Sequence, residues 1–414
     1  MQKPAVQTIV FLLTISMLTA CKSHKKTAGY PDIQPSTYTI EALAVSNNLF
    51  AVDLFKQMQS KSENLIFSPY SIGTVLAMIY SGSGGKTAME MREVLYFPEQ
   101  ERLDPVESIM RESLLVTDTM KGTDFRLANA IWAQEDFSFL PAYLARVENY
   151  YDAPLTLLDF METANREKSR KKINHWVGEK TNNRIRDLIQ PGILDASTRL
   201  VLTNAIYFNG GWMFPFDIAA TSPSLFHISH QESIKTDFMH QTRSYPYYED
   251  EEIQATSIPY RDNRMSLMVI LPRSFEGWRM ISQVINLERI NLVISEMETR
   301  EVQLALPKFR SELQINLRHE LTSMGMGTAF SRDADLSGMT GEKNLYVDEV
   351  IHKAFIEVNE KGTEAAAATA GIIGLKSSLR EDPVRFNADH PFIFFLLDRQ
   401  TGCIIFSGRL VKPS

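Results

Sequence analysis

Cysteine is almost absent from this chain of 414 residues, which contains only Cys21 and Cys403. Two cysteines cannot build a disulfide framework or a zinc site made of cysteine ligands. Cys403 lies in the apolar run Gly402-Cys403-Ile404-Ile405-Phe406, which has the composition of a strand. We therefore expect its thiol to be buried and inert.

Common catalytic and metal-binding motifs are missing as well. The sequence has neither a Gly-x-Ser-x-Gly nor a His-Glu-x-x-His motif. Gly84-Gly85-Lys86-Thr87 resembles the end of a phosphate loop, but Tyr80 occupies the position of the required first glycine. The glycine run is better explained as the end of a helix. His227 and His230 could hold a metal on a turn, but no third ligand follows with regular spacing. We therefore predict that this chain is not an enzyme and that it binds no metal and no cofactor.

The chain has no excess of positive charge, with 43 Lys and Arg against 50 Asp and Glu. A formal net charge of −7 argues against a general nucleic-acid surface. Glu249-Asp250-Glu251-Glu252 is most simply a solvated loop, and residues Arg166 to Lys172 are most simply one face of a helix. A hydrophobic content of 44% with 22% charged residues indicates a globular chain with a large core.

The amino-terminal residues have the pattern of an export signal. Lys3 is followed by an apolar run from Val6 to Leu18, which is too short to span a bilayer comfortably. The run ends in Leu18-Thr19-Ala20-Cys21, which resembles the lipobox of bacterial lipoproteins. That resemblance implies cleavage before Cys21 and acylation of its sulfur and new amino group. The alternative is a chance cysteine behind an ordinary signal.

These observations predict a lipoprotein signal at residues 1–20, a lipidated polar tether at 21–38 and one folded domain at 39–414. The tether is polar and is interrupted by prolines. Two or three acyl chains would hold the protein firmly on a membrane. Lys22, and not aspartate, follows the cysteine. We therefore expect the protein to be anchored to the outer membrane of a bacterium, on its periplasmic or surface face.

Helical spacing begins near Ile40, and Ser68-Pro69 has the pattern of a cap and first residue of a second helix that ends at Gly82. From Leu200 onward the sequence turns to strand-like runs. These are Leu200–Phe208, Met265–Leu271, Val302–Leu306, Ile351–Val358, and a hairpin formed by Phe392–Leu397 and Cys403–Phe406. Helices early and strands late, without repeats or an obvious linker, predict one large α+β domain.

Four segments in order resemble the serpin family of protease inhibitors. They are Phe67-Ser68-Pro69-Tyr70-Ser71-Ile72; Asn204-Ala205-Ile206-Tyr207-Phe208 with Trp212 and Pro215-Phe216; His352-Lys353-Ala354 through Asn359-Glu360-Lys361-Gly362-Thr363-Glu364-Ala365-Ala366-Ala367; and His390-Pro391-Phe392-Ile393-Phe394 with Phe406-Ser407-Gly408-Arg409. A single match would be weak evidence. Their order and spacing agree from about Ile40 to the carboxy terminus, so the chain is identified as a member of this family.

The resemblance implies a single-domain α+β serpin fold with about three β-sheets, about eight or nine helices and an exposed reactive loop. It also implies a monomer that inhibits serine proteases as a suicide substrate. The protease would attack the loop and form an acyl-enzyme, and the cleaved loop would insert into the central sheet as a new strand. The protease partner would be trapped covalently in this acyl complex.

In this family the cleaved residue is the seventeenth counted from the hinge glutamate, and from Glu360 that count reaches Lys376. The predicted reactive bond is therefore Lys376–Ser377, and a lysine there suits trypsin-like proteases. Counting back from Phe386 gives Ser378 instead, so the loop is about two residues longer than usual on its far side. Secondary cleavage candidates, for other serine or for cysteine proteases, are Leu375, Leu379 and Arg380.

The resemblance assigns further residues one by one. Ala365 to Ala368 alone would favour a buried helix, but the flanking Gly362 and Gly371 and the polar stretch after them fit an insertable loop better. Hinge residues are Glu360, Gly362, Thr363, Ala365, Ala367 and Thr369, and the four that would alternate into the interior, Thr363, Ala365, Ala367 and Thr369, are small and uncharged. A cluster beneath the central sheet, the shutter, comprises Ser68, Ser71, Asn204 and His352. A second group at the point of first insertion, the breach, comprises Trp212, Lys308 and Glu360, the last two as an ion pair.

A non-inhibitory serpin that serves as a binding or chaperone module is the alternative function. Such members tend to carry charged or bulky hinge residues, which this chain lacks. Protease titration would separate the two, because a binding module leaves the protease active.

Overall fold

The computed structural model describes residues 38–59, 64–115, 123–363 and 382–413. These residues form ten α-helices, of which eight contain eight or more residues. The helices are α1 (Ile40–Gln57), α2 (Pro69–Tyr80), α3 (Gly85–Leu95), α4 (Gln100–Leu115), α5 (Pro141–Tyr151), α6 (Thr163–Lys180), α7 (Gly277–Val284), α8 (Leu287–Ser295), α9 (Arg318–Ser323) and α10 (Ser337–Thr340). In the described part of the chain, none of them has the length and apolar character needed to cross a membrane.

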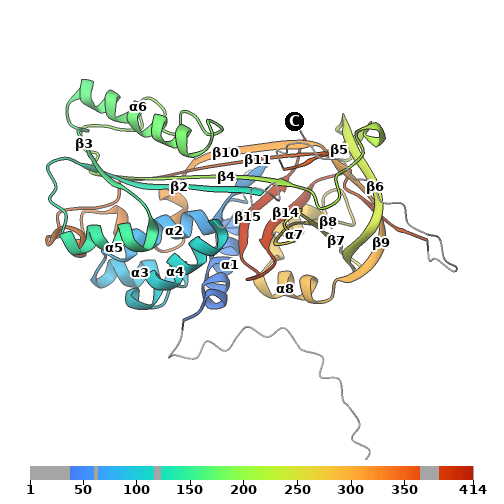
Figure 1. Cartoon of the computed structure of the whole chain (residues 1–414), viewed down its shortest axis with the longest axis horizontal. Coiled ribbons are helices and arrows are strands. Elements are labelled where there is room, and N and C mark those ends of the chain that lie inside the picture. The colour runs from blue at the N-terminus through green and yellow to red at the C-terminus, as the bar shows by residue number, and fades with distance from the viewer. Residues whose placement is uncertain (1–37, 60–63, 116–122, 364–381, 414) are drawn as a thin grey trace, which may run out of the picture.

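A six-stranded sheet runs along the molecule with helices on both faces (Figure 1). Its strands, in spatial order, are β10 (Phe309–Asn316), β11 (Glu349–Asn359), β12 (Gly362–Thr363), β4 (Leu200–Gly211), β2 (Thr123–Gln134) and β3 (Leu155–Leu158). Helix α6 covers one face and α2 the other, so a small core lies under α6 and the main core lies beneath the opposite face.

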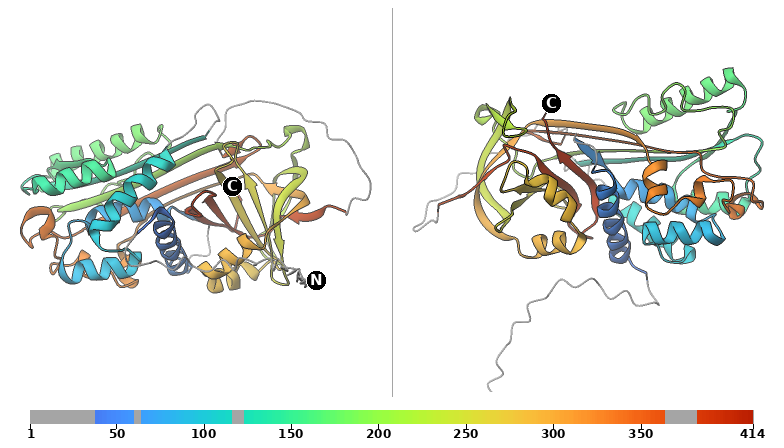
Figure 2. Two further views of the ribbon diagram at one scale, coloured as in Figure 1. Left: turned by 60° about the horizontal axis from the view of Figure 1, so that its bottom comes forward. Right: turned by 180° about the vertical axis from the view of Figure 1, so that it is seen from behind.

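The other strands form a nine-stranded sheet at the end of the molecule away from α3, α4, α5 and α6 (Figure 2). It contains β1 (Leu65–Phe67), β15 (Ile404–Leu410), β14 (Phe392–Asp398), β8 (Met265–Pro272), β7 (Ile253–Pro259), β6 (Ser233–Glu249), β9 (Glu298–Pro307) and β13 (Val384–Asn387), with β5 (Ser222–His227) beside β6. Strand β6 pairs with β9 over most of its length and with β7 only near its end. This strand therefore divides the sheet into two parts, which together with the six-stranded sheet give a three-sheet organisation.

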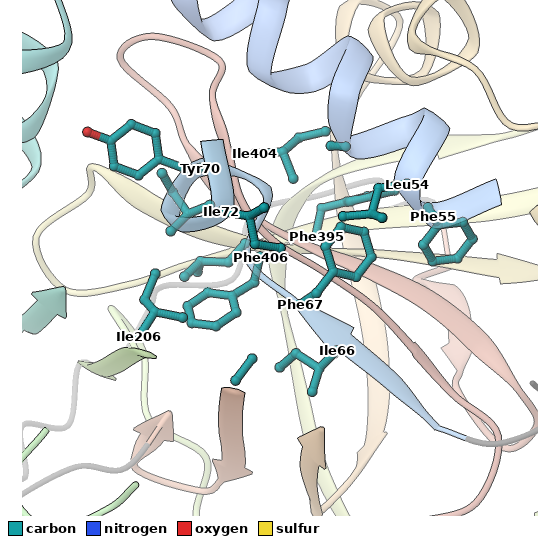
Figure 3. Close-up of a cluster of buried hydrophobic side chains, with 14 of the residues drawn as sticks. Leu54, Phe55, Ile66, Phe67, Tyr70, Ile72, Ile206, Phe395, Ile404 and Phe406 are labelled. Atoms are coloured by element: carbon teal, nitrogen blue, oxygen red, sulfur yellow. The ribbon is translucent and has the colours of Figure 1, made fainter. Parts of the chain in front are cut away.

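Helix α2 shows how the local sequence determines the position of the main core. Ser68 caps it, since its side chain accepts a hydrogen bond from the Ser71 N–H, and Pro69 is its first residue, as predicted. All twelve residues of α2 are buried. Its start brings Tyr70 and Ile72 into an apolar cluster with Ile206, Ile404 and Phe406 from the two sheets (Figure 3). The helix thus connects the six-stranded sheet to the hairpin of β14 and β15.

The expectation of helices first and strands later was only partly right. Strands β1, β2 and β3 lie within the helical first part of the chain, where no strand was expected. By contrast, the predicted burial of Cys403 is confirmed, because its side chain is fully buried. Burial raises the pKa of this thiol well above its usual value, so it remains protonated and unreactive.

Candidate functional site

The centre of the six-stranded sheet is a parallel pair formed by β4 and β11. Their register runs from Val201 beside Glu349 to Tyr207 beside Phe355. All other pairs in this sheet are antiparallel except that between β2 and β3. Parallel pairs are slightly less stable per residue than antiparallel pairs. The sheet is therefore joined at its middle by a comparatively weak seam.

A buried hydrogen-bond cluster lies directly beneath this seam and contains all four residues assigned to the shutter. Asn204 of β4 donates through Nδ2 to the carbonyl oxygen of Ser71 at 2.5 Å and to its Oγ at 2.6 Å. Asn204 Oδ1 also bonds His352 Nδ1 on β11, directly across the seam. Ser68 donates through Oγ to the Ile405 carbonyl at 2.6 Å. The cluster thus links β4, β11, α2 and β15.

The protonation state of His352 follows from its partners. Its Nε2 accepts the backbone N–H of Ser68 at 3.1 Å, so the ring proton must be on Nδ1, which donates to Asn204. Complete burial lowers the pKa of His352 from 6.5 to about 3. The imidazole is therefore neutral, and one tautomer joins the two central strands to α2.

Asn129 is a fifth member of this cluster, which the family resemblance did not assign. It lies on β2 beside Asn204 in register, and its Oδ1 accepts from Asn204 Nδ2 at 2.7 Å and from Ser71 Oγ at 3.2 Å. A polar residue within the apolar run Leu127 to Ala133 was the available signal.

Beyond the end of the seam at Tyr207 and Phe355, β12 lies between β11 and β4 and pairs antiparallel with both. The chain reverses after Asn359 and enters the sheet at Gly362. Gly362 has a φ of +147°, and a Cβ there would overlap the Gly210 carbonyl oxygen and lie 2.7 Å from the Gly211 Cα. Glycine is therefore the residue that permits this close approach of two backbones.

Thr363, the last residue described before the next gap, is fully buried in the sheet. Its Oγ1 shares a 2.6 Å hydrogen bond with the Tyr260 hydroxyl. Tyr260 in turn stacks on Trp212, with ring centroids 4.5 Å apart. Trp212 Nε1 donates to the Asn359 carbonyl at 2.9 Å, and its backbone N–H donates to the Lys361 carbonyl at 3.0 Å. These contacts hold the turn that leads into β12.

Glu360 at the tip of this turn forms an ion pair with Lys308, with Nζ and Oε1 3.1 Å apart. Thr221 Oγ1 donates to the same carboxylate oxygen at 3.1 Å. Partial burial would raise the pKa of Glu360, but hydrogen bonds from its own backbone and from Lys308 and Thr221 outweigh this and hold the pKa below its usual value. Trp212, Lys308 and Glu360 therefore meet at the open end of the seam.

Other predicted positions lie outside the described residues. These are Cys21, Ala365, Ala367, Thr369, Leu375, Lys376, Ser377, Leu379 and Arg380. The two histidines considered as metal ligands lie in the described part, where the rings of His227 and His230 both pack against Phe275. Within the described ranges, no group of three or more potential metal ligands is present.

Comparisons with known proteins agree with this geometry. The family model described as "Serpin (serine protease inhibitor)" matches residues 45–413. An uncharacterized serpin-like protein of Thermococcus kodakarensis is 40% identical, over 88% of this chain and 84% of its own length. The leukocyte elastase inhibitor of Sus scrofa is 37% identical, over 90% of this chain and 100% of its own length. The structure of Arabidopsis AtSerpin1, described as a native stressed conformation, is 28% identical with a TM-score of 0.81, over 91% of this chain and all of that one.

The architecture and these matches define a class of α+β proteins with a long central sheet. The chain belongs to the serpin family. The predicted serpin fold is confirmed, including its three-sheet organisation.

Proposed function

We propose that this chain inhibits trypsin-like serine proteases by a single-use trap, in which the cleaved reactive loop inserts between β4 and β11. The family and an inhibitor relative such as the pig leukocyte elastase inhibitor support protease inhibition in general. The observation that carries the detailed mechanism is the position of β12. Gly362 and Thr363 already occupy the start of the strand that insertion would extend.

The register of β12 specifies where each inserted residue would lie. Continuing the pairing of Gly362 and Thr363 along both neighbours brings Thr369 opposite Asn204 on β4 and His352 on β11. Insertion would therefore break the hydrogen bond between Asn204 and His352 and put the Thr369 hydroxyl in its place. A small residue with a donor and an acceptor fits a buried position between an amide and an imidazole.

Side-chain alternation supports the same register. Thr363 points into the interior, and residues 365, 367 and 369 would follow on the same face. All three are alanine or threonine, so insertion buries no charge. The parallel seam would be replaced by two antiparallel pairs, which supplies new backbone hydrogen bonds along the sheet.

The length of the inserted segment explains why a bound protease would be disabled. Thr363 to Lys376 is 14 residues, or about 46 Å at about 3.3 Å per residue. A compact domain of this size is roughly 55 Å across. The acylated protease would be carried across most of the inhibitor, and displacement of its oxyanion hole or base prevents deacylation.

We also propose that the inhibitor acts outside the cytoplasm as a lipid-anchored monomer. Cys21 would carry the lipid and residues 22–38 would form the tether to a bacterial outer membrane. A tether of about 17 residues reaches roughly 20–25 Å. This reach leaves the reactive loop accessible to a protease in solution.

The bond assignment is tested by incubating the chain with trypsin and sequencing the released carboxy-terminal fragment. We expect that fragment to begin at Ser377 while the rest of the chain remains attached to trypsin. A fragment that begins elsewhere contradicts the assignment of Lys376. Complete cleavage without an attached protease contradicts the inhibitory function.

A further inference from the structure

An acidic side chain lies inside the core where α4 packs against α2. Glu107 of α4 is only 2% exposed. Its Oε2 lies 3.5 Å from the hydroxyl of Thr74 on α2. That hydroxyl donates its proton to the Tyr70 carbonyl oxygen at 2.9 Å. Because a hydroxyl has only one proton, Glu107 and Thr74 share a hydrogen bond only when the carboxyl group is protonated and donates to Thr74.

The packing around Glu107 leaves no room to hydrate an ionised carboxylate. The space beside it measures about 10 Å³ and is lined by Asn47, by Tyr70 and otherwise by Gly73 and apolar residues. That volume is about the size of one water molecule. The Tyr70 hydroxyl is buried and makes no hydrogen bond with Glu107. Because an unpaired buried charge is costly, the ionised form requires α4 to move until water reaches the carboxylate.

The charged groups nearest to Glu107 are paired with other residues. Asp104, three residues earlier on α4, forms an ion pair with Arg146 of α5, with Oδ2 and Nε 2.6 Å apart. Arg111, one turn later on α4, lies 3.7 Å from the Asp152 carboxylate. Among the described residues, Glu107 itself forms no ion pair. Its surroundings therefore favour the neutral acid.

The remaining titratable groups that face Glu107 are neutral, because burial raises the pKa of each one. They are Tyr38, Tyr70, Tyr151 and Cys403. Burial, and secondly the Asp104 carboxylate, raise the pKa of Glu107 from 4.5 to about 8. These causes outweigh Thr74 and Arg111, which favour the charged form. Glu107 is therefore a neutral acid at pH 7.

Thr74 connects this acid to the shutter, because it lies one turn after Ser71 on α2. The carbonyl oxygen and the hydroxyl of Ser71 both accept from Asn204. We propose that Glu107 is a proton-operated link between α4 and α2, which as a neutral acid holds the two helices together and on ionisation releases α4. Release leaves α2 less supported and weakens the closed sheet. The link does not depend on the proposed function, but its effect on trapping does.

The link predicts a loss of stability as the pH rises. Between pH 4.5 and about pH 8 the native chain keeps a proton that the unfolded chain releases, so rising pH favours the unfolded chain. Glu107→Gln has nearly the same shape and cannot ionise. In urea unfolding at pH 6 and pH 8, the folded-to-unfolded ratio of the wild type should fall about tenfold or more relative to Glu107→Gln. Glu101→Gln, at an exposed position of the same helix, is the matched control and should follow the wild type.

Infrared difference spectra at pH 7 identify the proton directly. The wild type and Glu101→Gln should show a band of a protonated carboxyl group that Glu107→Gln lacks. Hydrogen exchange of α2 and α4 amides, corrected for the intrinsic effect of pH, should speed up at least threefold between pH 7 and pH 9 in the wild type and not in Glu107→Gln. The half-life of trypsin-inhibiting activity should shorten at least twofold over the same interval, again only in the wild type.

A missing carboxyl band, or unfolding of the wild type and Glu107→Gln that changes in parallel with pH, overturns the protonated acid. Equal exchange in the two proteins overturns the link between the helices. An unchanged half-life in a chain that inhibits trypsin overturns the effect on the sheet. A chain that never traps trypsin contradicts the proposed function and leaves the unfolding, infrared and exchange results standing.

Discussion

At the scale of single residues, the cluster around Asn204 depends on an uncharged imidazole at His352. Its Nε2 must accept from Ser68 while its Nδ1 donates to Asn204. A protonated ring would donate from both nitrogens and would leave the Ser68 N–H facing another donor. The join between the two central strands is therefore sensitive to one proton.

This arrangement predicts a loss of stability in acid. Above pH 6.5 both the native and the unfolded chain carry a neutral His352, so it adds no pH dependence. Below pH 6.5 the unfolded chain binds a proton, whereas the native chain, with its pKa lowered to about 3, does not. Relative to His352→Gln, the wild type should lose about 2 kcal/mol of unfolding free energy between pH 7 and pH 5.

Urea unfolding of both proteins at the two pH values measures this difference. His319→Gln, at an exposed histidine, is the control and should follow the wild type. A wild type and a His352→Gln variant that change in parallel with pH would contradict the assigned neutral imidazole.

At the scale of elements, the parallel seam of β4 and β11 and the short β12 between their ends form one device. Tyr260, Trp212, Lys308 and Thr221 hold the turn into β12, while Asn204 and His352 join the strands further along. In the proposed mechanism, insertion would need both regions to yield in turn. Residues on the inward face of the inserted strand would therefore control the outcome.

Thr363→Arg should convert the inhibitor into a substrate. Because Thr363 is already buried in β12, the arginine would expel the start of β12 from the sheet. Re-entry at the first step of insertion would then bury a charge against Tyr260 without compensation, at a cost of several kcal/mol. Insertion would slow, deacylation would win, and trypsin would be released active after cleaving the same bond. Glu364→Arg is the matched control, because the neighbouring position is expected to face solvent in the inserted strand.

Residual trypsin activity after mixing at equal concentrations measures both variants. Glu364→Arg should inhibit like the wild type, and Thr363→Arg should leave most of the activity. If Thr363→Arg forms the denaturant-resistant adduct as efficiently as Glu364→Arg, side-chain alternation does not govern insertion.

Much of this element structure could be predicted from residue patterns. The pair Ser68-Pro69 correctly predicted the start of α2. The predicted apolar runs that begin at Leu200, Met265, Ile351 and Phe392 correspond to β4, β8, β11 and β14. Strand β6 was missed, because several of its residues are exposed and its sequence is largely polar. Local pattern does not identify a strand whose partners, and not its own burial, stabilise it.

The site was less predictable because its contacts depend on register between distant segments. Asn129 contacts the shutter, Thr221 contacts Glu360, and Tyr260 contacts Trp212 and Thr363 only once segments distant in the sequence are aligned. No periodicity in the sequence specifies that alignment. The shutter and breach residues themselves came from the family resemblance and not from composition or spacing.

At the scale of the whole molecule, anchoring and inhibition should be separable. The first helix of the described residues, α1, begins at Ile40, and Thr39 caps it by accepting from the Ala42 N–H. Cys21→Ser should therefore move the protein from the membrane fraction to the soluble fraction without changing the amount of trypsin it inhibits. Cell fractionation and a trypsin titration of both forms measure this.

A Cys21→Ser protein that stays with the membranes contradicts the lipid anchor. A soluble form that no longer inhibits trypsin would show that the anchor contributes to the inhibitor itself. Lys22→Ala is the control and should leave both location and inhibition unchanged, because it keeps the lipobox residues Leu18 to Cys21.

The central claim is that a new strand enters between β4 and β11, and the width of the six-stranded sheet tests it most directly. Spin labels at Glu312→Cys on β10 and Arg126→Cys on β2, in a Cys21→Ser background, lie on opposite sides of the seam, in the row where Phe355 and Tyr207 are directly paired. Cys403 is buried and should not be labelled. After reaction with trypsin, the distance between the labels should increase by about 4.8 Å, the spacing of one strand. A distance that stays unchanged in the covalent adduct would contradict insertion.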